Sequence, residues 1–407
     1  MNRATTINMP RPHLIERLAH AHDARARDGL LRTLRSVEHV DGTRIHVGGR
    51  TLCNFASNDY LGLAQHPALR EALVRGAKKW GVGAGAAHLL GGHREEHEML
   101  EEKLARWLKR DRALLFSTGY MANLGVVQAL LGAQDLCVED KFNHASLIDA
   151  ARLAGCKFRR YVHADADSAG RQLGAQNEPD ASALVATDGV FSMDGDIAPL
   201  AELATLCSAR AALLFVDDAH GLGVVGSEGE GSIAAAGLTQ EDVPVLMATL
   251  GKALGVAGAF VAGSTMLIDG LVQFARTYVY TTALPPALAA ATSAAIDIAR
   301  HEKWRREKLQ RLIAHFRHGA AERGIVLLES ATPIQPVLIG ASEAASSAAA
   351  RLDAEGFYVP AIRPPTVAQG KARLRVTFSA LHEEADVELL LNALARAVSA
   401  ARRRRRG

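Results

Sequence analysis

The sequence predicts an α/β protein, with a large domain on a mostly parallel sheet and a smaller α+β domain at the C-terminal end. From about residue 113 to residue 262, short apolar runs of strand length alternate with helical segments, as in a parallel sheet with crossover helices. A long helical region follows Pro286, and two later strand-like runs indicate a second sheet. A chain of 407 residues is long enough for two or three domains.

The elements that precede this sheet are predicted from periodicity and turn residues. Residues 12–37 form a basic helical stretch, residues 43–55 form a short hairpin, and residues 95–108 form an amphipathic helix. The apolar face of that helix carries Met99, Leu100, Leu104, Trp107 and Leu108. We expect residues 1–60 to make a separate N-terminal segment.

The large domain is predicted over residues 61–290, and the small domain with a basic tail over residues 291–407. Strands of the large domain are expected at 113–116, 136–138, 157–161, 183–187, 213–216, 245–248 and 258–262. Helices between them are expected at 122–131, 146–154 and 200–209, and strands of the small domain near 334–339 and 374–378.

Composition and charge narrow the classes of function that the protein could have. Hydrophobic residues make up 48% and charged residues 22%, and the net charge of +3 gives no general attraction to nucleic acid. The arginine run from Arg402 to Arg406 is predicted to be a solvated terminus. No leader-like apolar core and no run long enough to span a bilayer is visible, so we expect a cytoplasmic protein without a membrane partner. The wide spacing of the cysteines predicts reduced thiols and no metal site. These cysteines are Cys53, Cys137, Cys156 and Cys207.

Lys252 is the most informative residue. It follows a predicted strand in the run Thr249-Leu-Gly-Lys252, and the strand before it ends in Asp217 and His220. Low-dielectric surroundings disfavour a charged lysine, which can then present a neutral amine. Because ligands of open α/β sheets bind beyond the carboxyl ends of strands, these three side chains predict a pyridoxal phosphate (PLP) site. Lys252 would form the Schiff base, and Asp217 would face the pyridinium nitrogen.

Other strand ends carry weaker signals. Gly119 and Tyr120 follow a strand and open a helix, which favours a phosphate site about as much as an ordinary strand-to-helix turn. His144 begins the next helix and could stack on an aromatic ring, although taken alone a histidine near a helix start is the simpler interpretation. The glycine runs at 221–226 and 81–86 lack the strand–turn–helix context of a dinucleotide site.

Over residues 23–391 the chain resembles the α-oxoamine synthases, which are fold-type I PLP-dependent transferases. The stretches that carry the resemblance are Ser57-Asn-Asp-Tyr-Leu-Gly62, Asn143-His-Ala-Ser146, Phe191-Ser-Met-Asp-Gly195, Val216-Asp-Asp-Ala-His-Gly221, Thr249-Leu-Gly-Lys252 and Tyr280-Thr-Thr-Ala-Leu-Pro-Pro286.

The resemblance implies a role for each matching residue. Lys252, Asp217, His220 and His144 would act in catalysis: Lys252 bonds covalently to PLP, Asp217 pairs with the ring nitrogen, His220 bonds the phenolic oxygen, and His144 stacks over the ring. The other cofactor-binding residues would be Gly119, Tyr120, Ser192, Thr249, Thr281 and Thr282, the last two serving the neighbouring subunit of a homodimer. The substrate-binding residues would be Arg32, Asn58, His144, Thr366 and Arg375.

The implied reaction is a decarboxylative condensation of an amino acid with an acyl thioester. Residues 361–367 and 372–375 resemble the branch that joins L-alanine to pimeloyl-CoA or pimeloyl-acyl carrier protein in biotin biosynthesis. The alternatives are a relative that joins glycine to acetyl-CoA, one that uses another pair, and a non-catalytic regulator that binds nucleic acid. One departure concerns residues 86–90, where many members have Ser, Thr or Arg near the acyl-substrate entrance and this chain has Ala-Ala-His-Leu-Leu.

Overall fold

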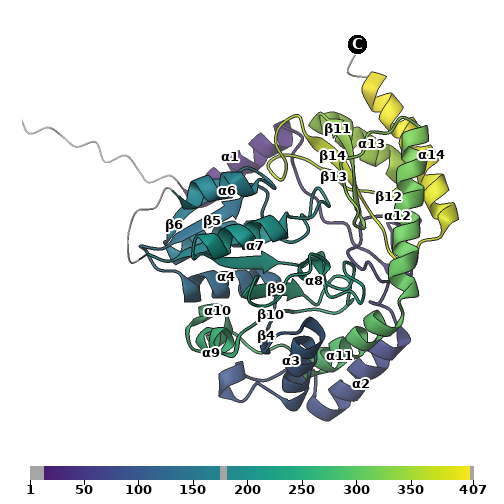
Figure 1. Ribbon diagram of the computed structural model, residues 1–407. Coiled ribbons are helices and arrows are strands. Elements are labelled where there is room, and N and C mark those ends of the chain that lie inside the picture. The colour runs from purple at the N-terminus through teal and green to yellow at the C-terminus, as the bar shows by residue number, and fades with distance from the viewer. Residues whose placement is uncertain (1–12, 175–180, 404–407) are drawn as a thin grey trace, which may run out of the picture.

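The computed structural model describes residues 13–174 and 181–403, and the side chains of Arg402 and Arg403 are not described. The arginine run that the sequence predicts to be solvated therefore lies outside the described side chains. Figure 1 shows a large sheet with helices on both faces, next to a smaller sheet with its own helices. In the described part of the chain, no helix has the length and apolarity needed to cross a membrane.

The large sheet has seven strands in the order β4-β10-β9-β8-β7-β5-β6. Pairing is parallel from β6 through β5, β7 and β8 to β9, whereas β10 runs antiparallel to both of its neighbours. This confirms the predicted mostly parallel sheet, and the five parallel strands end at one edge. The bounds are β4 (Arg112–Phe116), β5 (Leu136–Asp140), β6 (Lys157–Tyr161), β7 (Ala183–Asp188), β8 (Leu213–Asp217), β9 (Val245–Thr249) and β10 (Ala259–Gly263).

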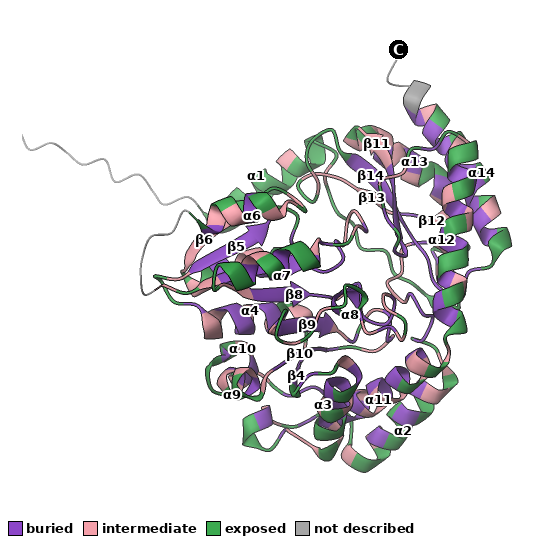
Figure 2. Cartoon of the chain, in the orientation of Figure 1, coloured by how far each residue is buried: buried purple, intermediate pink, exposed green. Residues whose placement is uncertain are grey.

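The strands of this sheet are apolar because both faces are covered. In β8, Phe215 packs on one face, and Leu214 and Val216 pack on the other, all of them buried. Figure 2 shows the central strands in the colour of buried residues. The helices that cover one face are α4 (Gly119–Leu130), α5 (Ala145–Ala154), α9 (Thr265–Phe274) and α10 (Arg276–Val279). Those on the other face are α6 (Ala166–Leu173), α7 (Leu200–Ala209) and α8 (Ser232–Ala235).

Three further helices pack together at the antiparallel edge of the sheet: α2 (Pro67–Trp80), α3 (Glu95–Leu108) and α11 (Pro286–His301). The bounds of α3 are those that its apolar periodicity predicts. Between α2 and α3 lies the glycine-rich segment, with a short 3-10 turn η1 (His88–Leu90).

The C-terminal part contains a three-stranded antiparallel sheet in the order β11-β14-β13. These strands are β11 (Ile334–Gly340), β13 (Ala361–Ile362) and β14 (Ala372–Thr377), and the helices around them are α12 (Trp304–Glu322), α13 (Ser342–Ala354) and α14 (Glu384–Arg403). The N-terminal strands β1 (His39–Asp41), β2 (Arg44–Val47) and β3 (Arg50–Asn54) join this part, because β3 pairs with β12 (Phe357–Tyr358).

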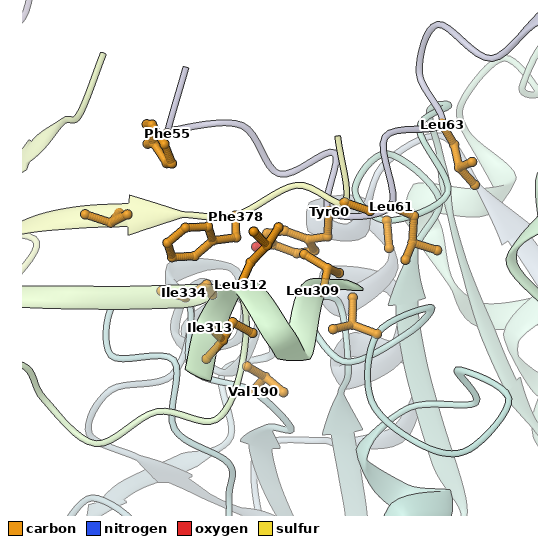
Figure 3. Close-up of a cluster of buried hydrophobic side chains, with 14 of the residues drawn as sticks. Phe55, Tyr60, Leu61, Leu63, Val190, Leu309, Leu312, Ile313, Ile334 and Phe378 are labelled. Atoms are coloured by element: carbon orange, nitrogen blue, oxygen red, sulfur yellow. The ribbon is translucent and has the colours of Figure 1, made fainter. Parts of the chain in front are cut away.

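A shared core supports these N- and C-terminal parts. Phe55 lies 5.7 Å from Phe378 between ring centroids, and Phe378 lies 5.2 Å from Phe316 of α12. Figure 3 shows the neighbouring side chains of Tyr60, Leu309 and other buried residues converging here. The division at residues 60 and 290 stays a prediction.

The predicted N-terminal helix over residues 12–37 is too long. The helix α1 covers Leu14–Arg27, and residues 30–38 have no regular structure. The cause is local, because Gly29 adopts a positive φ of 63°, the left-handed conformation that commonly ends helices.

Candidate active site

A cavity of about 200 Å³ lies where the parallel strands end. Asp188 closes β7, Asp217 closes β8 and Thr249 closes β9, while α4 and α5 begin beside them. Eight of the predicted site residues line this one cavity: Gly119, Tyr120, His144, Ser192, Asp217, His220, Thr249 and Lys252. It is also lined by Asn123, Ser146, Asp188, Val190, Ala219 and Met247.

The Lys252 amine is poised for nucleophilic chemistry. Its Nζ lies 2.8 Å from Nε2 of His220. Part of the side chain is accessible, but the amine is surrounded by protein, and this burial lowers the pKa of Lys252 to about 8. The nearby carboxyl groups of Asp217 and Asp188 oppose that shift. A useful fraction of the amine is therefore neutral near neutral pH.

His220 connects Lys252 to a buried hydrogen-bond chain. Its Nδ1 lies 2.7 Å from the hydroxyl of Tyr60, and that hydroxyl donates to Oδ1 of Asn58 at 3.2 Å. Burial, with Lys252 as the next cause, lowers the pKa of His220 well below its usual value. A neutral imidazole with its proton on Nδ1 satisfies every contact, because it donates to Tyr60 and accepts from Lys252.

Asp217 is held by two donors. Oδ2 accepts from Nδ2 of Asn123 at 2.7 Å, and Oδ1 accepts from the backbone N–H of Ala219 at 3.1 Å. The same Asn123 nitrogen donates to the Ser146 hydroxyl at 2.8 Å, which lies 2.7 Å from Nδ1 of His144. Asp217 and the His144 ring are thus fixed by one network that runs through α4 and α5.

Asp188 is a second carboxyl group beside Asp217, opposite it in the pairing of β7 and β8. Burial, followed by the proximity of Asp217, raises the pKa of Asp188 well above its usual value. The two acids consequently carry less than two charges between them. Asp188 Oδ1 accepts from the backbone N–H of His144 at 3.2 Å, so it also positions the imidazole.

Arg375 brings a buried positive charge from β14 to Ser192, which lines the cavity. Its Nε donates to the carbonyl of Ser192 at 2.7 Å, while its two terminal nitrogens make long contacts of 3.4 and 3.5 Å to Oδ1 of Asn58, and the guanidinium also interacts with the Tyr60 hydroxyl. The side chain is 6% exposed. The weakly engaged end of this guanidinium is suited to a carboxylate, which it can bind with two parallel bonds.

The cavity has the features that PLP requires. An amine can meet the aldehyde, a carboxylate can face the ring nitrogen, and an imidazole can cover the ring. The start of α4, capped by Thr118, supplies the positive end of a helix for the phosphate. Oδ1 of Asn123 is buried and has no hydrogen-bond partner among the described residues. The cavity therefore contains one hydrogen-bond acceptor that a bound molecule could satisfy.

Six predicted residues do not line this cavity, and two of them, Asn58 and Arg375, are joined by hydrogen bonds to Tyr60 and to the lining residue Ser192. The other four are Thr281, Thr282, Arg32 and Thr366, and the last three are exposed. Thr282 is nevertheless near, because its carbonyl accepts from the Ser117 hydroxyl at 3.3 Å. Arg363 donates to the carbonyl of Gly29, so residues 361–367 and the stretch before Arg32 are tied together. The roles of all the predicted site residues, inside the cavity and outside it, stay predictions.

A family model for aminotransferase class I and II matches residues 50–394. The chain belongs to this family. Its similarity to the 8-amino-7-oxononanoate synthases of Thioalkalivibrio sulfidiphilus and Methylococcus capsulatus is 56% identity, over 92% of this chain and 96% of each relative. These relatives confirm the resemblance to the α-oxoamine synthases.

Solved structures agree with this assignment to the aminotransferase class I and II family. The serine palmitoyltransferase of Sphingomonas wittichii is 29% identical, with a TM-score of 0.90 over 96% of this chain and 99% of the other. The 8-amino-7-oxononanoate synthase of Francisella tularensis is also 29% identical, with a TM-score of 0.75 over 86% and 98% of the chains. The fold-type I architecture is therefore confirmed.

This member of the class I and II family also shows site residues that the sequence did not single out. Asn123, Ser146, Tyr60 and Asp188 contact the predicted residues directly. Tyr60, Ser146 and Asp188 lie within or beside quoted motifs, so their positions were available as a signal. Asn123 lies in the interior of α4. Its contacts with Asp217 and Ser146 become visible only when α4 is packed against α5.

Proposed function

We propose that this chain is an 8-amino-7-oxononanoate synthase, which condenses L-alanine with a pimeloyl thioester and releases CO2 and the free thiol carrier. The observation that carries the proposal is the buried Lys252 amine, 2.8 Å from His220 and beside Asp217 in the cavity. The curated relatives that bear this enzyme's name, at 51–56% identity over most of the chain, support the substrate pair.

The cofactor is PLP, which when bound supplies the electron sink for the condensation. Lys252 would hold it covalently, Asp217 would pair with its ring nitrogen, and His144 would cover the ring. Gly119, Tyr120 and Thr249 would bind the phosphate end, and Ser192 would line the ring. The PLP bound in a related serine palmitoyltransferase from S. paucimobilis, which is 27% identical, supports this choice.

Proton transfer falls to Lys252. With L-alanine bound, the free Nζ of Lys252 would remove the substrate's α-proton and later return a proton. The low pKa of about 8 keeps the amine able to accept that proton. His220 orients Nζ through the 2.8 Å contact, and Tyr60 keeps the proton of His220 on Nδ1.

Arg375 and Asn58 would bind the alanine carboxylate. The terminal nitrogens of Arg375 hold Asn58 only loosely, so a carboxylate can replace that contact with shorter, charge-assisted bonds. Nε meanwhile stays on the Ser192 carbonyl, which keeps the guanidinium plane fixed during exchange.

The remaining roles depend on a second subunit and on the acyl donor. Thr281 and Thr282 would complete the phosphate site of the partner in a homodimer, and their place outside this chain's own cavity supports that arrangement. Arg32 and Thr366 would contact the acyl substrate, carried by CoA or acyl carrier protein. A cytoplasmic location is part of the proposal, and the four free cysteines support it.

The second candidate is a related condensation with a different substrate pair, favoured by the TM-score of 0.90 to a serine palmitoyltransferase. The deciding experiment offers alanine, glycine and serine with pimeloyl, acetyl and palmitoyl thioesters and follows thiol release. We expect turnover with alanine and the pimeloyl thioester. Turnover only with glycine and acetyl-CoA would overturn the substrate assignment and leave the family intact.

A further inference from the structure

Three histidines meet in a cluster outside the proposed active site. His88 comes from the 3-10 turn η1, His93 from the next loop, and His97 from the first turn of α3. Their ring centroids are 5.2, 5.2 and 5.4 Å apart, and one nitrogen from each ring lies within 4.8 Å of the others. The closest pair, Nδ1 of His88 and Nδ1 of His93, is separated by 2.9 Å.

These spacings are those of a metal site. With zinc–nitrogen bonds of about 2.0–2.1 Å in tetrahedral geometry, two ligand nitrogens lie about 3.3 Å apart. The pair from His88 and His93, at 2.9 Å, is near that spacing, and the third ring would have to move toward it from within 4.8 Å. Because Nδ1 of His88 and Nδ1 of His93 are in hydrogen-bond contact, at least one of the two carries no proton, which is the form that binds metals.

The outer nitrogen of His97 supports the same interpretation. Metal-binding histidines commonly donate their second N–H to a carbonyl or a carboxylate. Nε2 of His97 lies 2.6 Å from the carbonyl of Leu284, whereas Nε2 of His93, 3.9 Å from Oε2 of Glu101, is beyond hydrogen-bond distance of that carboxyl group. Nδ1 of His93 faces His88 in the cluster, whereas Nδ1 of His97 is occupied by a backbone N–H that a metal would have to displace.

A cluster held by hydrogen bonds alone is the competing explanation. Nδ1 of His97 accepts from the backbone N–H of Arg94 at 2.9 Å, and His88 stacks on Tyr278 at 4.9 Å between centroids. A metal would replace the Arg94 contact. That exchange is favourable, because one net backbone hydrogen bond contributes far less than a set of metal–nitrogen bonds.

We propose that His88, His93 and His97 bind one Zn²⁺, with water as the fourth ligand. Three imidazoles and a water suit the tetrahedral preference and the borderline-soft character of zinc. The His93 side chain is 32% exposed, which gives the ion and the water a route to a site whose other two ligands are buried.

The ion would fasten the glycine-rich segment to the helices around it. It would join η1 to α3, and through the Leu284 carbonyl to the chain just before α11. That chain already bonds the same segment, since the Ala283 N–H donates to the Ala86 carbonyl at 3.0 Å. Zinc would therefore stabilise residues 86–90, and with them the neighbouring Thr281 and Thr282, without taking part in the reaction.

The test is zinc binding by the holoenzyme, stripped with EDTA and exchanged into phosphate-free buffer. Zn²⁺ is titrated against a chromophoric chelator, and Co²⁺ absorption reports the coordination geometry. We expect one zinc per chain, a tetrahedral cobalt spectrum, a higher melting temperature with zinc, and about 100-fold weaker binding in His93→Gln. Unchanged PLP absorbance in this variant would establish that it is folded, because His93 lies outside the cofactor cavity.

The matched control is His318→Gln, since His318 is exposed on α12 and pairs with Glu322. It should bind zinc as the unaltered enzyme does. The proposal is overturned if the unaltered enzyme binds no zinc at stoichiometric addition, if His93→Gln binds it equally well, or if the control loses as much affinity. A His88→Gln variant repeats the test at a second ligand.

Discussion

Nζ of Lys252 and Nε2 of His220 are 2.8 Å apart, and both side chains have depressed pKa values because protein surrounds them. Because they are so close, it is unfavourable for both side chains to be positively charged. The hydrogen bond between His220 and the Tyr60 hydroxyl keeps the imidazole proton on Nδ1. The amine is consequently the donor in this contact and becomes neutral near pH 8. Binding of PLP and proton transfer both depend on that neutral amine.

The first prediction concerns pH. Burial moves the pKa of Lys252 down from 10.5 to about 8, so the neutral amine dominates above pH 8 and is lost as the pH falls below it. Covalent attachment of PLP to the apoenzyme should therefore slow by about tenfold per pH unit below 8 and level off above it. Stopped-flow absorbance measures this rate. A midpoint near 10.5 would contradict the buried-amine account.

Asp217→Asn should lose turnover by about 100-fold or more, on the scale of losing one electrostatic contact in a water-excluded site. The fold should persist, because an amide can keep one of the bonds to Asn123 and Ala219. Steady-state thiol release with circular dichroism measures both properties. Near-normal turnover would refute the pairing with the ring nitrogen.

Arg375→Lys should raise KM for L-alanine by about tenfold to 100-fold, because a single ammonium cannot make the paired bonds to a carboxylate. KM for the thioester should change little. Arg373→Lys is the matched control, since Arg373 is also buried in β14 but pairs with Asp194. Equal effects of the two substitutions on KM for alanine would argue for a purely structural role.

Subunit exchange tests the shared site. If Thr281 and Thr282 serve the partner's phosphate, a Lys252→Ala chain and a chain with both threonines changed to alanine are each inactive or weak alone. A mixed dimer places both sets of changes in one site and leaves the other intact, so each mixed dimer should have about half of the unaltered activity, and a random equal mixture of chains about a quarter. No gain on mixing would indicate that the threonines act within their own chain.

Much of the fold could be predicted because local patterns and tertiary packing agree. The buried strands β8 and β9 were predicted from apolar runs, and α3 from its one apolar face. The N-terminal helix was predicted too long, since periodicity gives little warning of a left-handed Gly29.

The site was predictable where residues end strands. Asp217 and Thr249 close β8 and β9, so the topology alone brings them to one edge. Asn123 could not be predicted in this way, because it reaches Asp217 from the interior of a helix. The three histidines were missed for a different reason: a spacing of five and then four residues has meaning only once η1 folds back onto α3.

The most direct measurement of the central claim is turnover by Lys252→Ala with L-alanine and a pimeloyl thioester. The account predicts that thiol release is abolished while PLP still binds non-covalently, because Asp217, His144 and the start of α4 remain. Absorbance after gel filtration reports the retained cofactor. Turnover equal to that of the unaltered enzyme would contradict the role of Lys252 and the account built on it.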